Sequence, residues 1–305
     1  METSPDSPGS DGGRTGGSGP APAPGESGTV RTNGVDTYYT RRGDGPAVVF
    51  VHGMGTNRRQ FESQAAALSD EFTTVTYDVR GHGDTGGSGE PTYTMELYAA
   101  DLHALLAALD LGPVVVCGLS MGGCVAQVYA AEHPERVAGV VLADTFTATP
   151  LSVRGRLLFA NLRVLAALDR VVRYPTLNRL QTRVGNRLAP GVAGDGVTTQ
   201  HLIEAAPTML HAEFAKVARS VAGFPASGFD AGRIRAPVLV LHGEHVPRTL
   251  REMHEHLAGA VTGADTELAV VPGAGHASNV DSPEAFTLEL RGFARRAFAV
   301  ADRAA

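Results

Sequence analysis

The apolar segments of this 305-residue chain alternate between two patterns, and this alternation limits the folds available to it. Short apolar or β-branched runs, typical of buried strands, alternate with longer segments that carry apolar residues at helical spacing. The strand-like runs are 47–51, 72–77, 113–117, 137–142, 237–241 and 267–271, and the clearest helical segments are 61–68, 95–109, 121–133 and 283–300. Alternating strands and helices build a mostly parallel sheet with helices on both faces, so we predict an α/β fold.

The N-terminal region differs from the rest of the chain. Residues 1–28 are rich in Gly, Pro and Ser and contain no apolar segment of the signal-peptide type, so we predict a disordered tail. In residues 30–39, Asn33-Gly34 separates two strand-like runs. This pair is typical of a β-hairpin closed by a type I′ turn.

A long segment without strand patterns interrupts the alternation. Residues 146–233 lie between two successive strand-like runs, and we find only helical patterns there, over 154–172, 177–188 and 201–221. Both ends of such an insertion are expected near the carboxyl edge of the sheet, where open α/β sheets bind ligands. We therefore predict a core of residues 29–145 and 234–305, with residues 146–233 forming a helical cap over a pocket.

Composition narrows the classes of partner. The formal net charge is −6, whereas nucleic-acid binding requires a basic surface. No apolar run approaches the length of a membrane-spanning helix, so we expect no membrane partner. The two cysteines, Cys117 and Cys124, are too few for a disulfide framework. We predict that both are reduced and that the protein is cytoplasmic.

Ser120 is the strongest candidate for a reactive residue. It lies in Gly118-Leu119-Ser120-Met121-Gly122, which follows a strand-like run and begins a helical segment. A G-x-S-x-G turn at this junction holds a serine hydroxyl out at the end of the sheet, and its tight backbone requires small residues two positions on either side. The helix that follows presents its N-terminus to a developing negative charge. We predict that Ser120 is a nucleophile.

Two further signals agree with this prediction. His52-Gly53-Met54-Gly55 follows the strand-like run 47–51, at the place where a loop supplies one backbone N–H of an oxyanion hole. The candidates for the two N–H donors are Met54 and Met121, the residue after the nucleophile. His276 follows the last strand-like run, where the general base belongs in the chain order serine, acid, histidine.

Together these motifs resemble the α/β-hydrolase superfamily over residues 35–297. The segment 52–61 and the Arg80-Gly81-His82-Gly83 loop are similar to those of the enol-lactonase, small carboxylesterase and perhydrolase-like group. The resemblance implies an α/β-hydrolase fold with a mostly parallel sheet of about eight strands. It also implies a serine hydrolase that cleaves a small-molecule carboxylic ester or lactone through an acyl-enzyme on Ser120, with no metal and no cofactor. The oligomeric state stays open, and a homo-oligomer is one of the alternatives.

The chain departs from the family pattern at the acid that orients the catalytic histidine. The pattern places this acid at position 246, where the chain has Val246. Asp144 ends the strand-like run 137–142 and is our first candidate, because both strand ends face the histidine loop. Glu244 is the second candidate, Asp281 ranks below it, and a site without an acid remains open. The last case favours a ligand-binding or signalling protein with weak or no turnover.

We assign no catalytic role to the other histidines discussed here. We interpret His82 as structural. His254-Glu255-His256, with His245 nearby, contains residue types that bind metals, but positions 254 and 256 face different sides of a helix. We therefore predict a solvated helix face there rather than a metal site.

Overall fold

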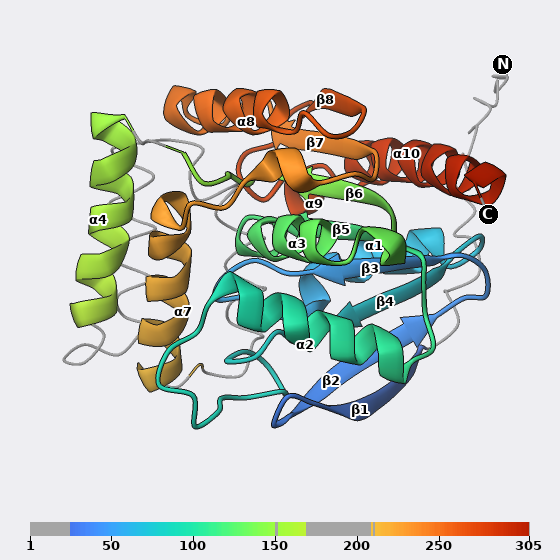
Figure 1. Ribbon diagram of the computed structural model, residues 1–305, viewed down its shortest axis with the longest axis horizontal. Helices are drawn as coiled ribbons and strands as arrows, with labels where there is room; N and C mark the ends of the chain where they lie inside the picture. The colour runs from blue at the N-terminus through green and yellow to red at the C-terminus, as the bar shows by residue number, and fades with distance from the viewer. Residues whose placement is uncertain (1–24, 150–151, 169–208, 210, 305) are drawn as a thin grey trace, which may run out of the picture.

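The computed structural model describes residues 25–149, 152–168, 209 and 211–304, and these form a sheet between two groups of helices (Figure 1). The strands are β1 (Glu26–Thr32), β2 (Val35–Arg42), β3 (Ala47–Val51), β4 (Thr73–Tyr77), β5 (Val114–Leu119), β6 (Val137–Ala143), β7 (Val238–Gly243) and β8 (Thr266–Val271). The α-helices are α1 (Glu62–Leu68), α2 (Met95–Ala108), α3 (Met121–Glu132), α4 (Val153–Leu168), α7 (His211–Gly223), α8 (Arg248–Ala260), α9 (Ser278–Asp281) and α10 (Pro283–Ala304). Short 3₁₀ helices are η1 (Arg58–Phe61), η2 (Pro134–Arg136), η3 (Phe224–Ala226) and η4 (Ala231–Arg233).

The described strands form one eight-stranded sheet in the order β1-β2-β4-β3-β5-β6-β7-β8. The pairs β1–β2 and β2–β4 are antiparallel, and all the others are parallel. The carboxyl ends of β3, β5, β6 and β7 therefore lie next to one another at one edge of the sheet. This arrangement confirms the predicted fold and brings together the loops that carry the candidate residues.

Each face of the sheet has its own hydrophobic cluster. Helices α2, α3 and α8 cover one face, and their apolar side chains pack on β3, β5, β6 and β7. Helices α1 and α10 cover the other face, where Phe61, Phe286 and Phe293 are buried. The strands β3, β4, β5 and β6 are buried along their whole length, because helices cover both of their faces.

The predicted hairpin is present, but its first strand begins earlier than expected. Asn33 and Gly34 have φ values of 39° and 88°, and positive φ at both central residues is characteristic of a type I′ turn. Strand β1 begins at Glu26, which pairs with Arg41, so residues 26–28 belong to the sheet rather than to the predicted tail. The polar composition of these residues fits an edge strand that faces solvent. Residues 1–24 lie outside the described part of the chain.

The described elements between β6 and β7 are helical. Helix α4 corresponds to the predicted segment 154–172, and α7 corresponds to the end of the predicted segment 201–221. The predicted segment 177–188 lies outside the described residues. Helices α4 and α7 pack against each other beside one end of the sheet (Figure 1).

Polar contacts of a single lysine fasten α7 to the core. Lys216 is the only lysine of the chain. Its Nζ donates to the Ser88 carbonyl oxygen at 2.8 Å and forms an ion pair with Glu213 at 2.9 Å. The Glu213 carboxylate in turn accepts a hydrogen bond from the Tyr93 hydroxyl, and Lys216 lies 4.8 Å from the centre of the Tyr93 ring. These contacts hold α7 against the loop that precedes α2.

Candidate active site

Ser120 lies on a strained turn between β5 and α3, as the G-x-S-x-G motif predicts. Its φ of 54° and ψ of −114° are unfavourable for a residue with a side chain, and such strain persists only where the surroundings enforce it. A Cβ at Gly118 would lie 2.2 Å from the Gly122 carbonyl oxygen, and a Cβ at Gly122 would lie 1.9 Å from the Val51 carbonyl oxygen. Both glycines are therefore required by close backbone approach.

The turn brings Ser120 and His276 together. His276 lies between β8 and α9, in the segment 272–277, which we call the His276 loop. Its Nε2 is 3.2 Å from the Ser120 Oγ, at the long end of hydrogen-bond distance. This pair matches a nucleophile and its general base, which are commonly looser before substrate binds. Burial lowers the pKa of His276 to about 4, so the ring is neutral and able to accept a proton at pH 7.

The other ring nitrogen of His276 has no hydrogen-bond partner among the described residues. His276 Nδ1 is buried, and neither Asp144 nor Glu244 accepts a hydrogen bond from it. Val246, at the position where the family pattern has the acid, is 3% exposed and packs in the hydrophobic cluster with α8. The structure therefore brings Ser120 and His276 together and shows no hydrogen bond between His276 and the predicted acid, Asp144.

Asp144 holds the backbone near His276 instead. It follows β6, has a φ of 45° and is 1% exposed. Its Oδ1 accepts the Gly243 N–H at 3.0 Å, and its Oδ2 accepts both the N–H, at 3.2 Å, and the hydroxyl of Ser278. Burial raises the pKa of Asp144 to about 7, although these three hydrogen bonds oppose the shift. Asp144 thus joins the ends of β6 and β7 to the segment that carries His276.

The two remaining acid candidates also contact backbone N–H groups of the His276 loop. Glu244 Oε2 accepts the Gly273 N–H at 2.9 Å, and Asp281 Oδ2 accepts the Gly275 N–H at 2.9 Å. With Asp144, which binds Ser278 directly after the loop, three carboxylates therefore fix the backbone on either side of His276. The sequence placed all three near His276 but did not indicate that they would contact main-chain groups.

The predicted oxyanion donors have backbone N–H groups that are not used within the described structure. Met121 is the first residue of α3, where an N–H has no partner inside the helix. Met54 lies in the segment 52–55 after β3, which we call the oxyanion loop. Neither N–H donates to another described residue, so both are available to a ligand. Their role in binding an oxyanion stays a prediction.

Two buried histidines support the oxyanion loop. His52 Nε2 accepts the Val79 N–H at 3.0 Å, and His82 Nε2 accepts the Gly55 N–H at 3.2 Å. The two rings meet edge to face at 4.9 Å. Burial lowers the pKa of His52 to about 4 and that of His82 to about 3, so both are neutral at pH 7 and can accept through Nε2.

We expect the His82→Ala substitution to lower kcat by about tenfold to a hundredfold while KM changes little. The Gly55 N–H would lose its acceptor, and the adjacent Met54 N–H would be held less firmly. Complete loss of one oxyanion donor typically costs about 10²–10³ in kcat, so a misaligned donor should cost less. Steady-state kinetics on a p-nitrophenyl ester measures both constants, and His82→Gln, which keeps an acceptor atom, serves as the control. A folded His82→Ala protein with unchanged kcat would contradict this role.

The loop that carries His82 is fixed by a buried ion pair. Arg80 donates two hydrogen bonds to Asp101 of α2, both at 2.7 Å, and a third to the Asn33 carbonyl oxygen at 2.9 Å. Both side chains are almost completely buried. This two-point geometry fixes the direction of the loop after β4, so the structural interpretation of His82 agrees with its surroundings.

The prediction that His254, Glu255 and His256 form a solvated helix face is wrong for His254. His254 is 1% exposed and stacks on His242 of β7, with ring centres 5.2 Å apart, whereas Glu255 and His256 are exposed. Position 254 falls on the side of α8 that packs against the sheet, so its ring is covered. Among the described residues, no group of three or more His, Cys, Asp or Glu side chains could hold a metal ion.

The lowered pKa values of four histidines indicate that acid destabilises the fold. Burial lowers the pKa of His52 and His276 to about 4 and that of His82 and His254 to about 3, from 6.5. The stability that these groups contribute is present above pH 6.5 and is lost as the pH falls towards 4, because only the unfolded chain then binds the protons.

Asp144 acts in the opposite direction. Because the pKa of Asp144 is raised in the folded protein, this group stabilises the fold below pH 4, and the stabilisation is lost between pH 4 and 7. The effect of this single carboxyl group is smaller than the combined effect of the four histidines. Each pKa unit corresponds to about 1.4 kcal/mol, so we expect a free energy of unfolding several kcal/mol lower at pH 5 than at pH 7.5. Urea denaturation followed by circular dichroism measures this difference. An unfolding free energy that is unchanged or higher at pH 5 would contradict it.

Comparisons with known proteins agree with this architecture. Residues 46–283 match the family model described as alpha/beta hydrolase fold. The chain is 28% identical over 285 residues to 3-oxoadipate enol-lactonase 2 of Acinetobacter baylyi, covering 88% of this chain and 96% of that protein. It is 30% identical over 256 residues to 2-(acetamidomethylene)succinate hydrolase of Mesorhizobium japonicum, covering 80% and 86%.

Solved structures give the same result. A thermophilic esterase from Thermogutta terrifontis superposes with a TM-score of 0.72 at 26% identity, covering 89% of this chain and 99% of that one. The enol-lactonase from Burkholderia xenovorans superposes with a TM-score of 0.69 at 26% identity, covering 87% and 99%. The order of the strands, the serine turn after β5 and these matches lead to one conclusion: the chain belongs to the α/β-hydrolase fold family.

Proposed function

We propose that this protein hydrolyses a small-molecule carboxylic ester or lactone through an acyl-enzyme on Ser120. The observation that carries the proposal is the 3.2 Å approach of His276 Nε2 to the Ser120 Oγ on a strained turn at the carboxyl edge of the sheet. The proteins to which the chain is similar include an enol-lactonase and an esterase, which supports this class of substrate.

The proposed mechanism uses only groups of the chain. His276 Nε2 removes the hydroxyl proton as the Ser120 Oγ attacks the carbonyl carbon, and the Met54 and Met121 N–H groups bind the resulting oxyanion. Collapse of the tetrahedral intermediate expels the alcohol, or opens the lactone ring, as His276 returns the proton to the leaving oxygen. Water then attacks the acyl-enzyme by the same route and releases the acid. This scheme requires neither a metal nor a cofactor.

The Arg80–His82 loop and the three carboxylates around the His276 loop make the proposed site rigid. Such rigidity favours catalysis, because donors that are already oriented need no reorganisation as charge develops. Lack of a carboxylate on His276 Nδ1 has the opposite effect, since a general base without that partner is neither oriented nor stabilised when protonated. We therefore propose a slow hydrolase rather than a highly efficient one.

The unpartnered Nδ1 and Val246 also favour a second candidate function. A protein that binds an ester-like ligand and turns it over weakly or not at all would keep the shape of the site without needing a strong base. The similarity of the chain to an enol-lactonase and to other hydrolases favours the first candidate.

Labelling with a fluorophosphonate probe separates the two functions. We expect one covalent label on Ser120, identified by peptide mass spectrometry, and measurable hydrolysis of p-nitrophenyl acetate. The Ser120→Ala protein should show neither, and its unchanged circular dichroism would confirm that it is folded. Absence of both labelling and turnover in the wild-type protein would reject the hydrolase and leave the ligand-binding function.

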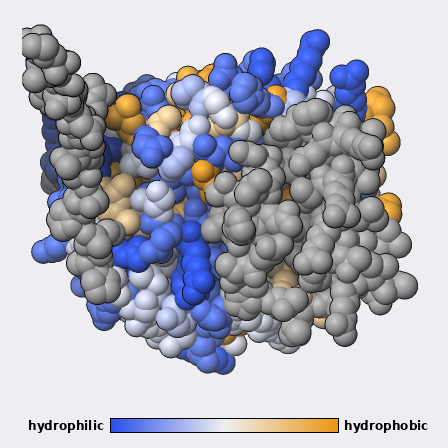
Figure 2. Space-filling view, turned by 180° about the vertical axis from the view of Figure 1, so that it is seen from behind, coloured by the Kyte–Doolittle hydropathy of each residue, from blue (hydrophilic) through white to orange (hydrophobic). Residues whose placement is uncertain are grey.

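The described surface is mostly polar on one face of the molecule. On the face shown in Figure 2, most of the coloured residues are hydrophilic and the hydrophobic ones are scattered. Within the described residues, no helix is long and apolar enough to cross a membrane.

A further inference from the structure

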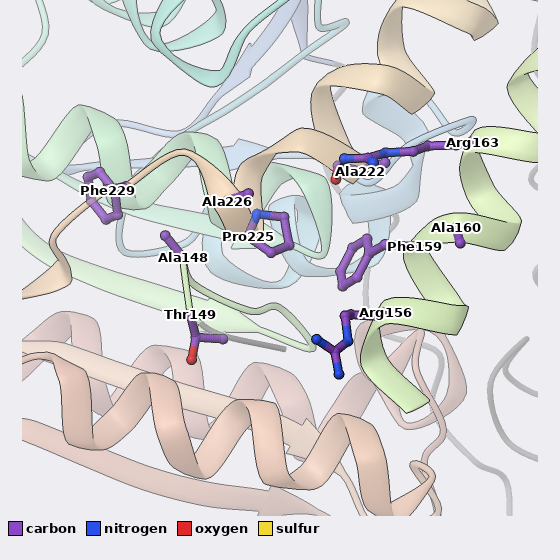
Figure 3. Close-up of a pocket in the computed structure, with 11 residues that line it drawn as sticks. Ala148, Thr149, Arg156, Phe159, Ala160, Arg163, Ala222, Pro225, Ala226 and Phe229 are labelled. Atoms are coloured by element: carbon purple, nitrogen blue, oxygen red, sulfur yellow. Dashed lines mark hydrogen bonds between the residues drawn. The ribbon is translucent and has the colours of Figure 1, made fainter. Parts of the chain in front are cut away.

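A pocket of about 710 Å³ lies outside the Ser120 site, between α4 and the segment 222–229, which comprises the end of α7 and the residues after it (Figure 3). Its volume falls within the range of roughly 300–1,000 Å³ that is typical of small-molecule sites. Most of its described lining is apolar: Phe159 comes from α4, and Pro225 and Phe229 come from the opposite wall. Figure 3 shows Phe159 and Pro225 facing each other across it.

Neither Ser120 nor His276 belongs to the described lining of this pocket. The Phe146 ring packs on Phe159 with ring centres 4.8 Å apart, and the Phe146 carbonyl oxygen accepts a hydrogen bond from Gln127 of α3 at 2.9 Å. Phe146 therefore contacts both a lining residue of the pocket and the helix that begins after Ser120.

Two guanidinium groups interrupt the apolar lining. Arg156 and Arg163 are seven residues apart on α4, about two turns, so they lie on the same side of the helix. Figure 3 shows both side chains extending from α4 towards the wall formed by Thr149 and Ala222. Arg163 donates to the Ala222 carbonyl oxygen at 3.1 Å, which fixes its position.

Arg156 is the more available of the two. Its guanidinium forms no hydrogen bond and no ion pair with another residue that the structure describes. A guanidinium presents several N–H donors in one plane and binds a carboxylate through two parallel hydrogen bonds. An anion at the Arg156 end would also be attracted by the charge of Arg163.

We propose that this pocket binds an amphiphilic carboxylate of the medium-chain fatty-acid class. The carboxylate binds the Arg156 guanidinium, and the hydrocarbon chain packs against Phe159, Pro225 and Phe229. Apolar walls alone would accept a neutral chain equally well, but the two cations favour a ligand with a negative head group. This site does not depend on the chemistry of Ser120, so it stands even if the protein is not a hydrolase.

Calorimetric titration with octanoate tests the site, with 1-octanol as the uncharged comparison. We expect saturable binding of one octanoate per chain and at least tenfold weaker binding of 1-octanol. The Arg156→Gln protein should bind octanoate at least tenfold more weakly than the wild type. Arg154→Gln removes the same charge from an exposed position of α4 outside the pocket, and it should bind within twofold of the wild type. Circular dichroism checks that both variants are folded.

Three results would overturn the proposal. Failure of the wild-type protein to bind octanoate would do so, and so would equal weakening by Arg154→Gln and Arg156→Gln, which indicates general surface charge. The third is loss of octanoate binding after a fluorophosphonate has modified Ser120, because it would place the carboxylate in the catalytic site. Unchanged affinity after that modification is expected if the pocket is separate.

Discussion

Replacement of Val246 with aspartate is expected to raise kcat/KM for an ester substrate by about a hundredfold. His276 Nδ1 is buried without a partner among the described residues, and position 246 follows β7, where the family pattern places the acid. Loss of the function of the acid costs about 10⁴ in kcat in serine-protease triads, so a new carboxylate should recover part of such a factor. Steady-state kinetics on p-nitrophenyl acetate measures the gain.

The pH profile identifies the cause of this gain. In the wild-type protein the pKa of His276 is lowered to about 4 by burial, so activity should fall only near that pH. A carboxylate beside the ring favours its protonated form, so the acid limb of Val246→Asp should move to higher pH. Val246→Asn is the matched control, because it has nearly the same shape without the charge. If Val246→Asp is folded and shows neither higher activity nor a shifted limb, the missing acid does not limit turnover.

Replacement of Asp144 with asparagine is expected to lower kcat by about a hundredfold or more and the free energy of unfolding by about 1–3 kcal/mol. The Asp144 carboxylate accepts hydrogen bonds from Gly243 N–H and from both donors of Ser278. In asparagine, one of the two acceptor positions becomes an NH₂ group that meets a donor, which leaves a buried polar group unsatisfied. The positive φ at this position suits asparagine, so the backbone itself should tolerate the change. Kinetics and urea denaturation measure the two effects.

Two further variants decide how Asp144 acts. Ser278→Ala removes one of its hydrogen bonds without changing charge, so a parallel loss of kcat would mean that Asp144 acts by positioning the His276 loop. A large loss in Asp144→Asn, with nearly normal activity in Ser278→Ala, would mean that the carboxylate acts on the imidazole itself. Glu244→Gln keeps an acceptor for the exposed Gly273 contact and should change activity little. Wild-type activity in Asp144→Asn would reject both roles.

The sequence predicts most of the core elements, because their local patterns reflect burial on both faces or on one. The apolar runs 47–51 and 137–142 coincide with β3 and β6 to within one residue, since parallel strands covered on both faces leave no polar positions. The start of β1 was less predictable. Its exposed polar residues, such as Ser27, are common in tails, and only pairing with β2 makes them a strand.

Around the site, local motifs were more informative than isolated side chains. The requirement for Gly118 and Gly122 follows from short-range backbone geometry, so the motif alone identifies the turn of Ser120. The partners of Asp144 come from segments 99 and 134 residues away, and no sequence pattern shows whether a carboxylate meets an imidazole or a main-chain N–H. For the same reason the support of the oxyanion loop by His82 could not be read from its glycine-rich surroundings.

The solitary amine side chain of this protein has a practical consequence. Because Lys216 is held by the Ser88 carbonyl oxygen and Glu213, succinimidyl esters should acylate it slowly while α7 is docked. Because the chain has no other lysine, fast acylation of a lysine side chain would come from molecules in which α7 has moved away from the core. One peptide in a mass spectrum would thus report the docking of this helix.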